Sequence, residues 1–229
     1  MDRRVTLPRR PKAVVFDMDG LLIDTIPAYV SAMVEAGHDV GHVVSKDYVL
    51  SLVGLLGPEL EAQLRSDHGT AFPLPAYMAA VSARLGPILD AGVPLKAGAS
   101  ELLEALARAD MPMAIGTSMT RKEALRHLNR CEIEHFFRSV AARDDVARGK
   151  PHPDVHLKAM SALGFEPRDC LILEDSFNGV RAAHATGAMV IMVPDVVAPT
   201  PEIAALCIGV AIDLHQVEEI IGRMETPAN

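Results

Sequence analysis

Residues 13–20 read AVVFDMDG, an apolar run that gives way to two aspartates and a glycine. A short run that ends in this way is typical of a buried parallel strand followed by a loop. We expect the strand to span 13–18. Similar runs recur at 113–116, 140–142, 170–173, 189–193 and 209–212. They are rich in apolar residues such as Val, Ile and Leu, and most of them are four or five residues long. The chain is therefore expected to form several strands of one parallel sheet.

Segments with helical spacing separate these runs, at 100–109, 120–130, 153–163 and 177–186. Thr120 and Glu123 have the spacing of a capping box, and Pro153 and Gly164 bracket the third segment as helix start and stop signals. Strands that alternate with helices and cross over with the right hand form a doubly wound sheet. We therefore predict an α/β fold whose core is a Rossmann-like, doubly wound parallel sheet.

The alternation stops between the first strand and the helix at 100–109. In its place stand helix-like segments separated by Gly and Pro, at 28–35, 46–52, 58–65 and 77–85. This block predicts an inserted, all-helical cap domain at 26–95. The core domain would then consist of 1–25 and 96–229, with Gly92, Pro94 and Gly98 as candidate hinge residues.

Composition narrows the class of protein. Of 229 residues, 49% are hydrophobic and 23% charged, which is typical of a globular chain. Thirty acidic residues against twenty-two basic ones leave a net charge of −8, which argues against nucleic-acid binding. Three scattered cysteines suit neither a disulfide framework nor a zinc site.

With no leader or membrane span visible, we expect a cytoplasmic protein that does not bind membranes. We expect a monomer, because no apolar stripe is left over once the two domains pack.

Polar residues follow the predicted strands at the points where ligands bind in such sheets. Asp17 and Asp19 follow the first strand, and Thr117 and Ser118 follow the second. Lys150 comes after the third, and Glu174–Asp175 end the fourth. The carboxyl ends of parallel strands share one edge, so we expect these side chains to converge there.

Carboxylates crowded in this way raise each other's pKa unless a cation lies among them. A hard divalent ion with oxygen ligands meets that need, and Mg²⁺ fits best. Lys150 and the Thr117 hydroxyl suit phosphate oxygens, and the amides at the start of the 120–130 helix could hold an anion. Metal, lysine, hydroxyl and amides together indicate a phosphoryl-transfer site.

An aspartate can act as the nucleophile by forming an acyl phosphate. If Asp17 attacks, Asp19 lies two residues on and can protonate the leaving oxygen. An Asp with a pKa of ~3.9 is protonated at pH 7 only at a cost of about 4 kcal/mol, so the site must raise the pKa of Asp19. Direct coordination of its carboxylate would lower that pKa, so we expect Asp19 to bind the metal through its carbonyl.

The sequence DMDGLLIDT at 17–25 resembles the first motif of the haloacid dehalogenase superfamily of phosphohydrolases. Thr117, Lys150 in GKPHPD and Glu174–Asp175 in LEDSFNG fall where that superfamily has its other motifs. The position of the insertion resembles the subgroup with a small helical cap, which includes β-phosphoglucomutase and sugar-phosphate phosphatases.

The resemblance implies a role for each matched residue. Asp17 would be the nucleophile and Asp19 the acid and then the base, with Thr117 and Lys150 completing the catalytic set. Phosphate would be bound by Met18, Thr117, Ser118 and Lys150. The Mg²⁺ ligands would be Asp17, Asp19, Glu174 and Asp175. Asp24 would orient the loop or only close a turn.

Two differences between this sequence and members of the superfamily help to choose among their activities. Dehalogenases lack the second Asp of DxD, so Asp19 argues against dehalogenation. β-Phosphoglucomutase has a histidine where this chain has Tyr29, which weakens the mutase interpretation. We therefore predict hydrolysis of a small phosphate ester, expected to be a sugar phosphate, with a phosphohexomutase of the β-phosphoglucomutase type as the alternative.

Two other classes are less consistent with the sequence. A receiver-type signalling module combines similar residues but is about half as long and lacks the insertion, and a non-catalytic relative would not need all four motifs. In the cap, Tyr29, Arg65 and His68 are candidates for substrate contact. Of the nine histidines, His152 is the one whose place in the sequence, beside Lys150, suggests the site.

Overall fold

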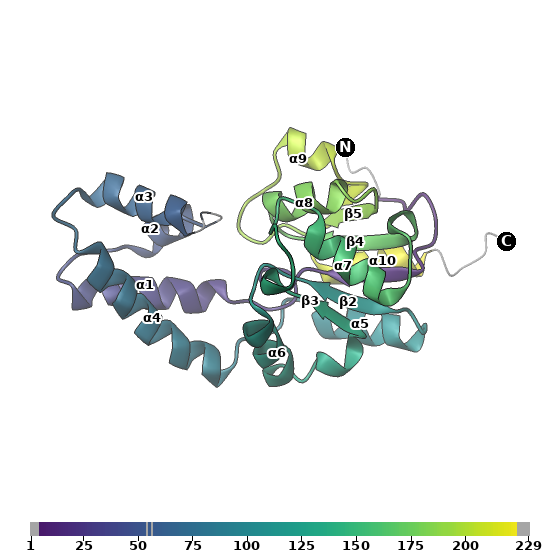
Figure 1. The fold of residues 1–229 in the computed structure, drawn as a ribbon, viewed down its shortest axis with the longest axis horizontal. Coiled ribbons are helices and arrows are strands. Elements are labelled where there is room, and N and C mark those ends of the chain that lie inside the picture. Colours follow the sequence, from purple (N-terminus) through teal and green to yellow (C-terminus); the bar gives the residue numbers. More distant parts are fainter. Residues whose placement is uncertain (1–4, 54, 56, 224–229) are drawn as a thin grey trace. The chain divides into compact units, whose positions relative to one another are not determined.

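The computed structural model describes residues 5–53, 55 and 57–223, and Figure 1 shows their fold. The chain divides into two compact units. The core unit joins residues 1–24 to residues 94–229, and the cap unit comprises residues 25–93. The junctions proposed from the sequence, after residues 25 and 95, lie close to these.

The core unit contains one six-stranded parallel sheet in the order β3-β2-β1-β4-β5-β6. Its strands are β1 Ala13–Phe16, β2 Met113–Gly116, β3 Ser139–Ala141, β4 Cys170–Glu174, β5 Met189–Met192 and β6 Gly209–Val210. Each predicted apolar run is confirmed as a strand. Strand β1 is central, with Phe16 opposite Ile115 of β2 and Leu173 of β4. This register places the residues that follow β1, β2 and β4 at one edge of the sheet.

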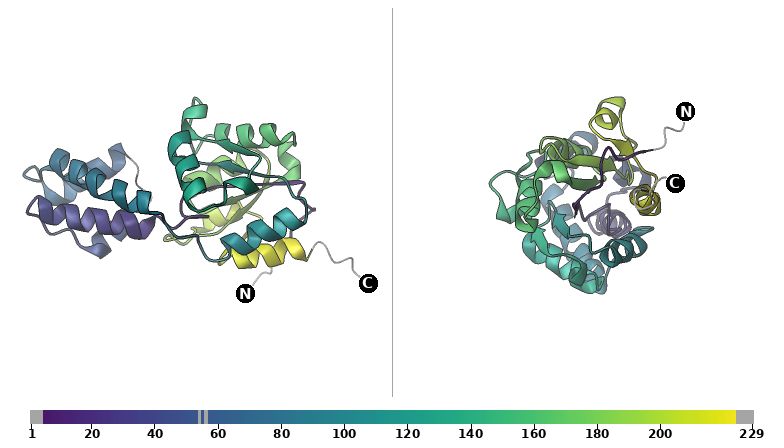
Figure 2. Two further views of the ribbon diagram at one scale, coloured as in Figure 1. Left: turned by 90° about the horizontal axis from the view of Figure 1, so that it is seen from below. Right: turned by 90° about the vertical axis from the view of Figure 1, so that its right-hand side faces the viewer.

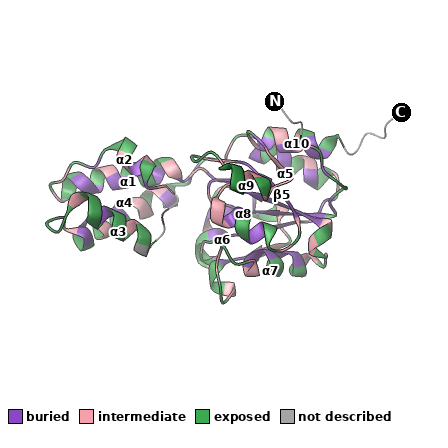
Figure 3. Cartoon of the chain, turned by 90° about the horizontal axis from the view of Figure 1, so that it is seen from above, coloured by how far each residue is buried: buried purple, intermediate pink, exposed green. Residues whose placement is uncertain are grey.

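Helices cover both faces of the sheet, which confirms the doubly wound architecture. The core helices are α5 Ala99–Arg108, α6 Arg121–Arg130, α7 Asp154–Leu163, α8 Phe177–His184, α9 Pro201–Ala205 and α10 Leu214–Gly222. Helices α5 and α10 lie side by side on one face, and α7 and α8 pack on the other (Figures 2 and 3). Among the described residues, this unit also has three short 3-10 turns, at Glu134–Phe136, Arg143–Asp145 and Pro167–Asp169.

Local signals account for most helix starts. The predicted capping box at Thr120 and Glu123 is present at the start of α6, with both reciprocal hydrogen bonds. Helices α9 and α10 were not expected from the sequence. Both carry start signals all the same: Thr200 caps α9 ahead of Pro201, and Asp213 caps α10.

The cap unit is built from helices, as predicted. They are α1 Ile26–Asp39, α2 Lys46–Ser51, α3 Pro58–His68 and α4 Leu74–Ala91. Helices α1 and α4 form its largest interface, where the buried Tyr77 hydroxyl donates to the Met33 carbonyl at 3.1 Å. Helix α4 runs further in both directions than the predicted 77–85, and it continues through Pro87. Among the described residues of the whole chain, no helix is both long and apolar enough to cross a bilayer.

Candidate active site

The site begins where β1 ends. Asp17 continues the ladder of β1, because its N–H donates to the Leu173 carbonyl at 3.0 Å, and its side chain is buried. The chain then turns at Gly20, whose φ is +84°. A side chain at Gly20 would collide with the carboxylate of Asp175, so the loop passes directly beside the end of β4. The loop therefore brings the first and fourth strand ends together.

Lys150 links two of the carboxylates. Its ammonium group contacts Oδ1 of Asp17 and lies 2.6 Å from Oε1 of Glu174, and its side chain is only 5% exposed. A buried cation held between two buried carboxylates has little freedom to move. Lys150 is thus fixed beside Asp17, although 133 residues separate the two in sequence.

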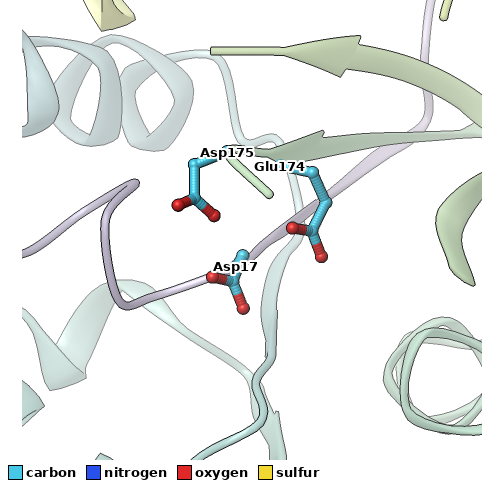
Figure 4. A group of neighbouring side chains, drawn as sticks. All are labelled: Asp17, Glu174 and Asp175. Carbon is cyan, nitrogen blue, oxygen red and sulfur yellow. The ribbon is translucent and has the colours of Figure 1, made fainter. Parts of the chain in front are cut away.

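Asp17, Glu174 and Asp175 form a compact acidic cluster (Figure 4). One oxygen of each lies within 4.8 Å of the others, a spacing at which they could share a metal ion. Oδ1 of Asp175 is buried and, among the described residues, has no hydrogen-bond partner. The cluster therefore has both the geometry and an unsatisfied oxygen suited to a cation.

Burial and neighbouring charges move the pKa values of all three carboxylates away from their usual range. Burial, more than the neighbouring carboxylates, raises the pKa of Asp17 from 3.8 to about 7, against the opposing effect of Lys150. Burial and the charge of Asp17 likewise raise the pKa of Asp175 well above its usual value. Burial also acts on Glu174, but there the charge of Lys150 and the contact with His156 outweigh it and lower its pKa. One lysine thus does not neutralise the cluster.

Asp19 and Met18 lie in the same loop but outside this cluster. Asp19 is half-buried, and its charge contributes to raising the pKa values of both Asp17 and Asp175. The Met18 side chain is fully buried, and its carbonyl accepts from the N–H groups of Leu22 and Ile23. Met18 can therefore meet a ligand only through its backbone.

Thr117 is buried at the end of β2, one strand away from Asp17. Its N–H donates to the Ala141 carbonyl at 3.0 Å, and its Oγ1 accepts from the Met119 N–H at 3.2 Å. The hydroxyl keeps its hydrogen for another acceptor. Ser118, the next residue, is exposed.

The start of α6 offers fewer amides than the sequence suggested. The N–H groups of Thr120 and Glu123 are used in the capping box, and that of Arg121 donates to Oδ1 of Asp144 at 2.8 Å. These three amides are therefore already engaged within the protein, which reduces what this helix start can offer to an anion. Ser118, which precedes these groups, is the better candidate.

Asp144 and Asp145, which also follow a strand, take no part in the acidic cluster. Asp145 accepts from the Arg121 guanidinium at 2.5 and 3.1 Å and from the Ala142 N–H at 2.8 Å. Together with the bond from Arg121 N–H to Asp144, these contacts tie the loop after β3 to α6. Their role is structural, because their oxygens are directed at α6 and its neighbouring loop.

Sequence reasoning missed one histidine. His152, the candidate beside Lys150 in the chain, is exposed. His156 on α7 is instead fully buried, with Nε2 at 2.9 Å from Oε1 of Glu174. The available signal was its helical spacing, because His156 shares the buried face of α7 with Val155 and Ala159.

A second missed feature lies at the junction with the cap. Lys96 binds Asp195 at 2.6 Å and lies 3.7 Å from Asp24. The backbone pairs there as well, with Asp24 N–H donating to the Pro94 carbonyl and Lys96 N–H to the Leu22 carbonyl, both at 2.9 Å. Asp24 thus helps to hold the two connecting segments side by side at the core.

In the cap unit, His68 is part of an aromatic group. Its ring stacks on Phe72 at 4.6 Å and meets Tyr48 edge-on at 5.0 Å. Tyr29 is 39% exposed, and Arg65 is exposed. The ring of His68 thus packs within the cap, whereas Tyr29 and Arg65 are the candidates exposed to solvent.

Comparison with known proteins gives consistent matches. Residues 14–193 match the family described as haloacid dehalogenase-like hydrolase. A phosphorylated carbohydrates phosphatase from Thermotoga maritima is 30% identical over 178 residues, 77% of this chain and 82% of that protein. Hexitol phosphatase A from Escherichia coli is 32% identical over 216 residues, 92% of this chain and 94% of that protein.

Solved structures match along almost the whole chain. A HAD family hydrolase from Deinococcus radiodurans R1, with bound phosphate and sodium, has a TM-score of 0.82 and 26% identity. The match covers 95% of this chain and 98% of that one. Core and cap units are therefore both shared with a solved relative.

Proposed function

The chain belongs to the haloacid dehalogenase-like hydrolase family and is a phosphoric monoester hydrolase, and from this premise we propose that it hydrolyses a sugar phosphate through an aspartyl-phosphate on Asp17. The main support is a single observation. Asp17 is buried at the end of the central strand, in contact with Lys150 and within one small acidic cluster with Asp175. A solvated strand end would have no need of such partners.

The residues present fit Mg²⁺, which we propose as the cofactor. Asp17 and Asp175 provide hard oxygen ligands, and Asp175 has a buried oxygen without a hydrogen-bond partner among the described residues. We propose that the carboxylate of Glu174 and the backbone carbonyl of Asp19 complete the set around the ion, which leaves the Asp19 side chain free to carry a proton. When bound, Mg²⁺ would keep these carboxylates ionised and offset the charge on the phosphoryl oxygens.

The first step would transfer the phosphoryl group to the enzyme. A carboxylate oxygen of Asp17 attacks phosphorus, the bond from phosphorus to the ester oxygen breaks, and Asp19 gives its proton to that leaving oxygen. Lys150 and the Thr117 hydroxyl would bind phosphoryl oxygens, and Ser118 and the backbone of Met18 would contribute further contacts.

The second step would regenerate the enzyme. Asp19, now a carboxylate, takes a proton from water, whose oxygen attacks phosphorus. The bond between phosphorus and Asp17 breaks, which releases inorganic phosphate and restores the Asp17 carboxylate. A sugar phosphate is the proposed substrate because relatives over most of the chain are a phosphorylated carbohydrates phosphatase and a hexitol phosphatase.

The test is phosphate release from a panel of sugar phosphates and other small phosphate esters, with Mg²⁺ and with EDTA. Asp17→Asn keeps the shape of the nucleophile and removes its charge. Asp169→Asn is the matched control, because Asp169 precedes β4 at the opposite edge of the sheet, where it pairs with Lys12 at 3.0 Å. Rapid quenching and mass spectrometry of the wild type would detect phosphorylated Asp17.

We expect metal-dependent release by the wild type and Asp169→Asn, and none by Asp17→Asn. Release that survives in Asp17→Asn would refute the proposed nucleophile. Conversion of a hexose 1-phosphate to its 6-phosphate without net phosphate release would replace the phosphatase by the mutase alternative.

A further inference from the structure

One buried histidine in the core unit has no place in the chemistry described so far. His156 lies on α7, and both its side chain and that of Glu174 are fully shielded from solvent. Its Nε2 is 2.9 Å from Oε1 of Glu174, the same oxygen that lies 2.6 Å from the ammonium of Lys150. The contacts therefore run in series from His156 through Glu174 and Lys150 to Asp17.

The room for this ring is provided by a strand of the sheet. Gly116 is the last residue of β2, and a Cβ built on it would lie 2.8 Å from Nδ1 of His156. Any larger residue at that position would push the imidazole away from Glu174. The absence of a side chain at Gly116 on β2 thus allows the ring of His156 on α7 to reach the carboxylate of Glu174.

The two ring nitrogens of His156 contribute little to the stability of the fold. Both ring nitrogens are buried without an aligned hydrogen bond among the described residues, so Nε2 meets Glu174 as a close contact only. Burying nitrogens in this state is unfavourable, and an apolar side chain would avoid that cost. Core packing alone therefore does not explain a histidine here.

The ring is suited to a donor role. An imidazole carries at least one N–H in either protonation state, so the ring can donate at the nitrogen that lies 2.9 Å from Glu174. The nitrogen that faces a carboxylate is the one expected to hold that hydrogen. Glu174 is further confined by α8, since its Oε2 lies 3.5 Å from Ser176 Oγ and packs against Gly179.

We propose that His156 is a positioning residue, which holds the carboxylate of Glu174 in place so that Lys150 stays directed at Asp17 and at the phosphoryl group bound there. This inference rests on the proposed function, because it assigns Lys150 to the phosphoryl group. Without the contact at Nε2 of His156, the Oε1 side of the Glu174 carboxylate would be held less firmly, and the position of Lys150 with it.

The experiment compares three substitutions in the Mg²⁺-loaded protein. His156→Phe keeps an aromatic ring and removes the donor, and His156→Gln restores an N–H at a similar reach. His152→Phe is the matched control at an exposed histidine of the preceding loop. Each protein is measured for kcat and KM on the best phosphate ester of the panel, for inorganic phosphate affinity by calorimetry, and for its melting temperature. His156→Leu replaces His156→Phe if the latter does not fold.

We expect His156→Phe to lower kcat by about 10- to 100-fold, the usual cost of losing a partner that orients an active-site group. Phosphate affinity should fall with it, while KM changes less. His156→Gln should recover most of both, and His152→Phe should match the wild type.

Two results would overturn the inference. Wild-type kinetics and phosphate affinity in folded His156→Phe would show that Lys150 does not depend on the ring. Equal losses in His156→Gln and His156→Phe would show that only packing matters at this position. A wild type that neither binds phosphate nor releases it would instead count against the proposed function, which keeps the two failures distinct.

Discussion

Replacing Gly179 by alanine tests the geometry around Glu174 directly. Gly179 lies in the first turn of α8, where a Cβ would come within 2.5 Å of Oε1 of Glu174 and closer still to Oε2. Real Cβ atoms essentially never approach other atoms within 3.0 Å, so Oε1 must retreat by at least 0.5 Å and Oε2 by more. The whole carboxylate would therefore be displaced from its present position against Lys150 and His156, which weakens both contacts.

The expected cost follows from three contributions. Overpacking a buried site costs about 1–3 kcal/mol. A buried carboxylate separated from its cation adds to this, toward the 3–5 kcal/mol typical of a broken buried pair. Alanine in place of glycine within a helix returns about 1 kcal/mol. The free energy of unfolding should thus fall by about 2 kcal/mol or more, a large part of a typical 5–15 kcal/mol.

The measurement is urea unfolding of the wild type, Gly179→Ala and Gly222→Ala, together with phosphate release. Gly222 is the matched control, because it ends α10 and a Cβ there would meet nothing within 4 Å. We expect the control to keep the activity of the wild type and to match its stability or exceed it by up to about 1 kcal/mol, whereas Gly179→Ala should lose both activity and stability. Gly179→Ala that is as stable and as active as Gly222→Ala would refute the placement of Glu174.

Three further predictions follow from single contacts. Thr120→Ala removes the capping box of α6 and should lower the free energy of unfolding by about 1 kcal/mol, measured by urea unfolding; an unchanged value would mean that the cap contributes nothing. Tyr77→Phe deletes the buried hydrogen bond to the Met33 carbonyl and should also cost about 1 kcal/mol, seen as a lower melting temperature; no shift would contradict a buried bond in the cap. The third prediction concerns pH, measured in EDTA. The pKa of Asp17 is about 7 in the folded protein, against 3.8 for an unperturbed Asp. Between these values the folded state binds one more proton than the unfolded state, so the free energy of unfolding falls as the pH rises from about 4 to 7. Melting curves of wild type and Asp17→Asn should diverge in that window and Mg²⁺ should raise the wild-type melting temperature at pH 7.5; parallel curves would argue against the shift.

Much of the fold could be predicted from local patterns in the sequence. All six apolar runs became strands, because a strand buried on both faces needs an apolar side chain at nearly every position. The helical insertion was equally visible from its spacing. Helices α9 and α10 were missed, although Thr200 and Asp213 cap them, because α9 is short and both lie near the weak strand β6.

The candidate site was predictable in its members but not in its contacts. Asp17 and Asp175 follow strands, and Glu174 ends one, at a shared edge of the sheet, so their convergence could be predicted from topology alone. The residues that contact these carboxylates could not be predicted from topology. Asp144 also comes after a strand, yet its carboxylate accepts from the N–H of Arg121 and serves α6 instead. Which acidic residue reaches the cluster depends on loop geometry.

The sequence by itself determined the α/β class, the helical insertion and the set of residues able to handle a phosphoryl group, because periodicity and strand-end chemistry are local properties. Only the tertiary structure decided which of those groups touch. His156 reaches Glu174 because Gly116, forty residues away on β2, leaves room for its ring. Lys150 is held beside Asp17 because burial makes an unpaired charge too costly. Packing and desolvation act between distant segments, so they become visible only when the chain is folded.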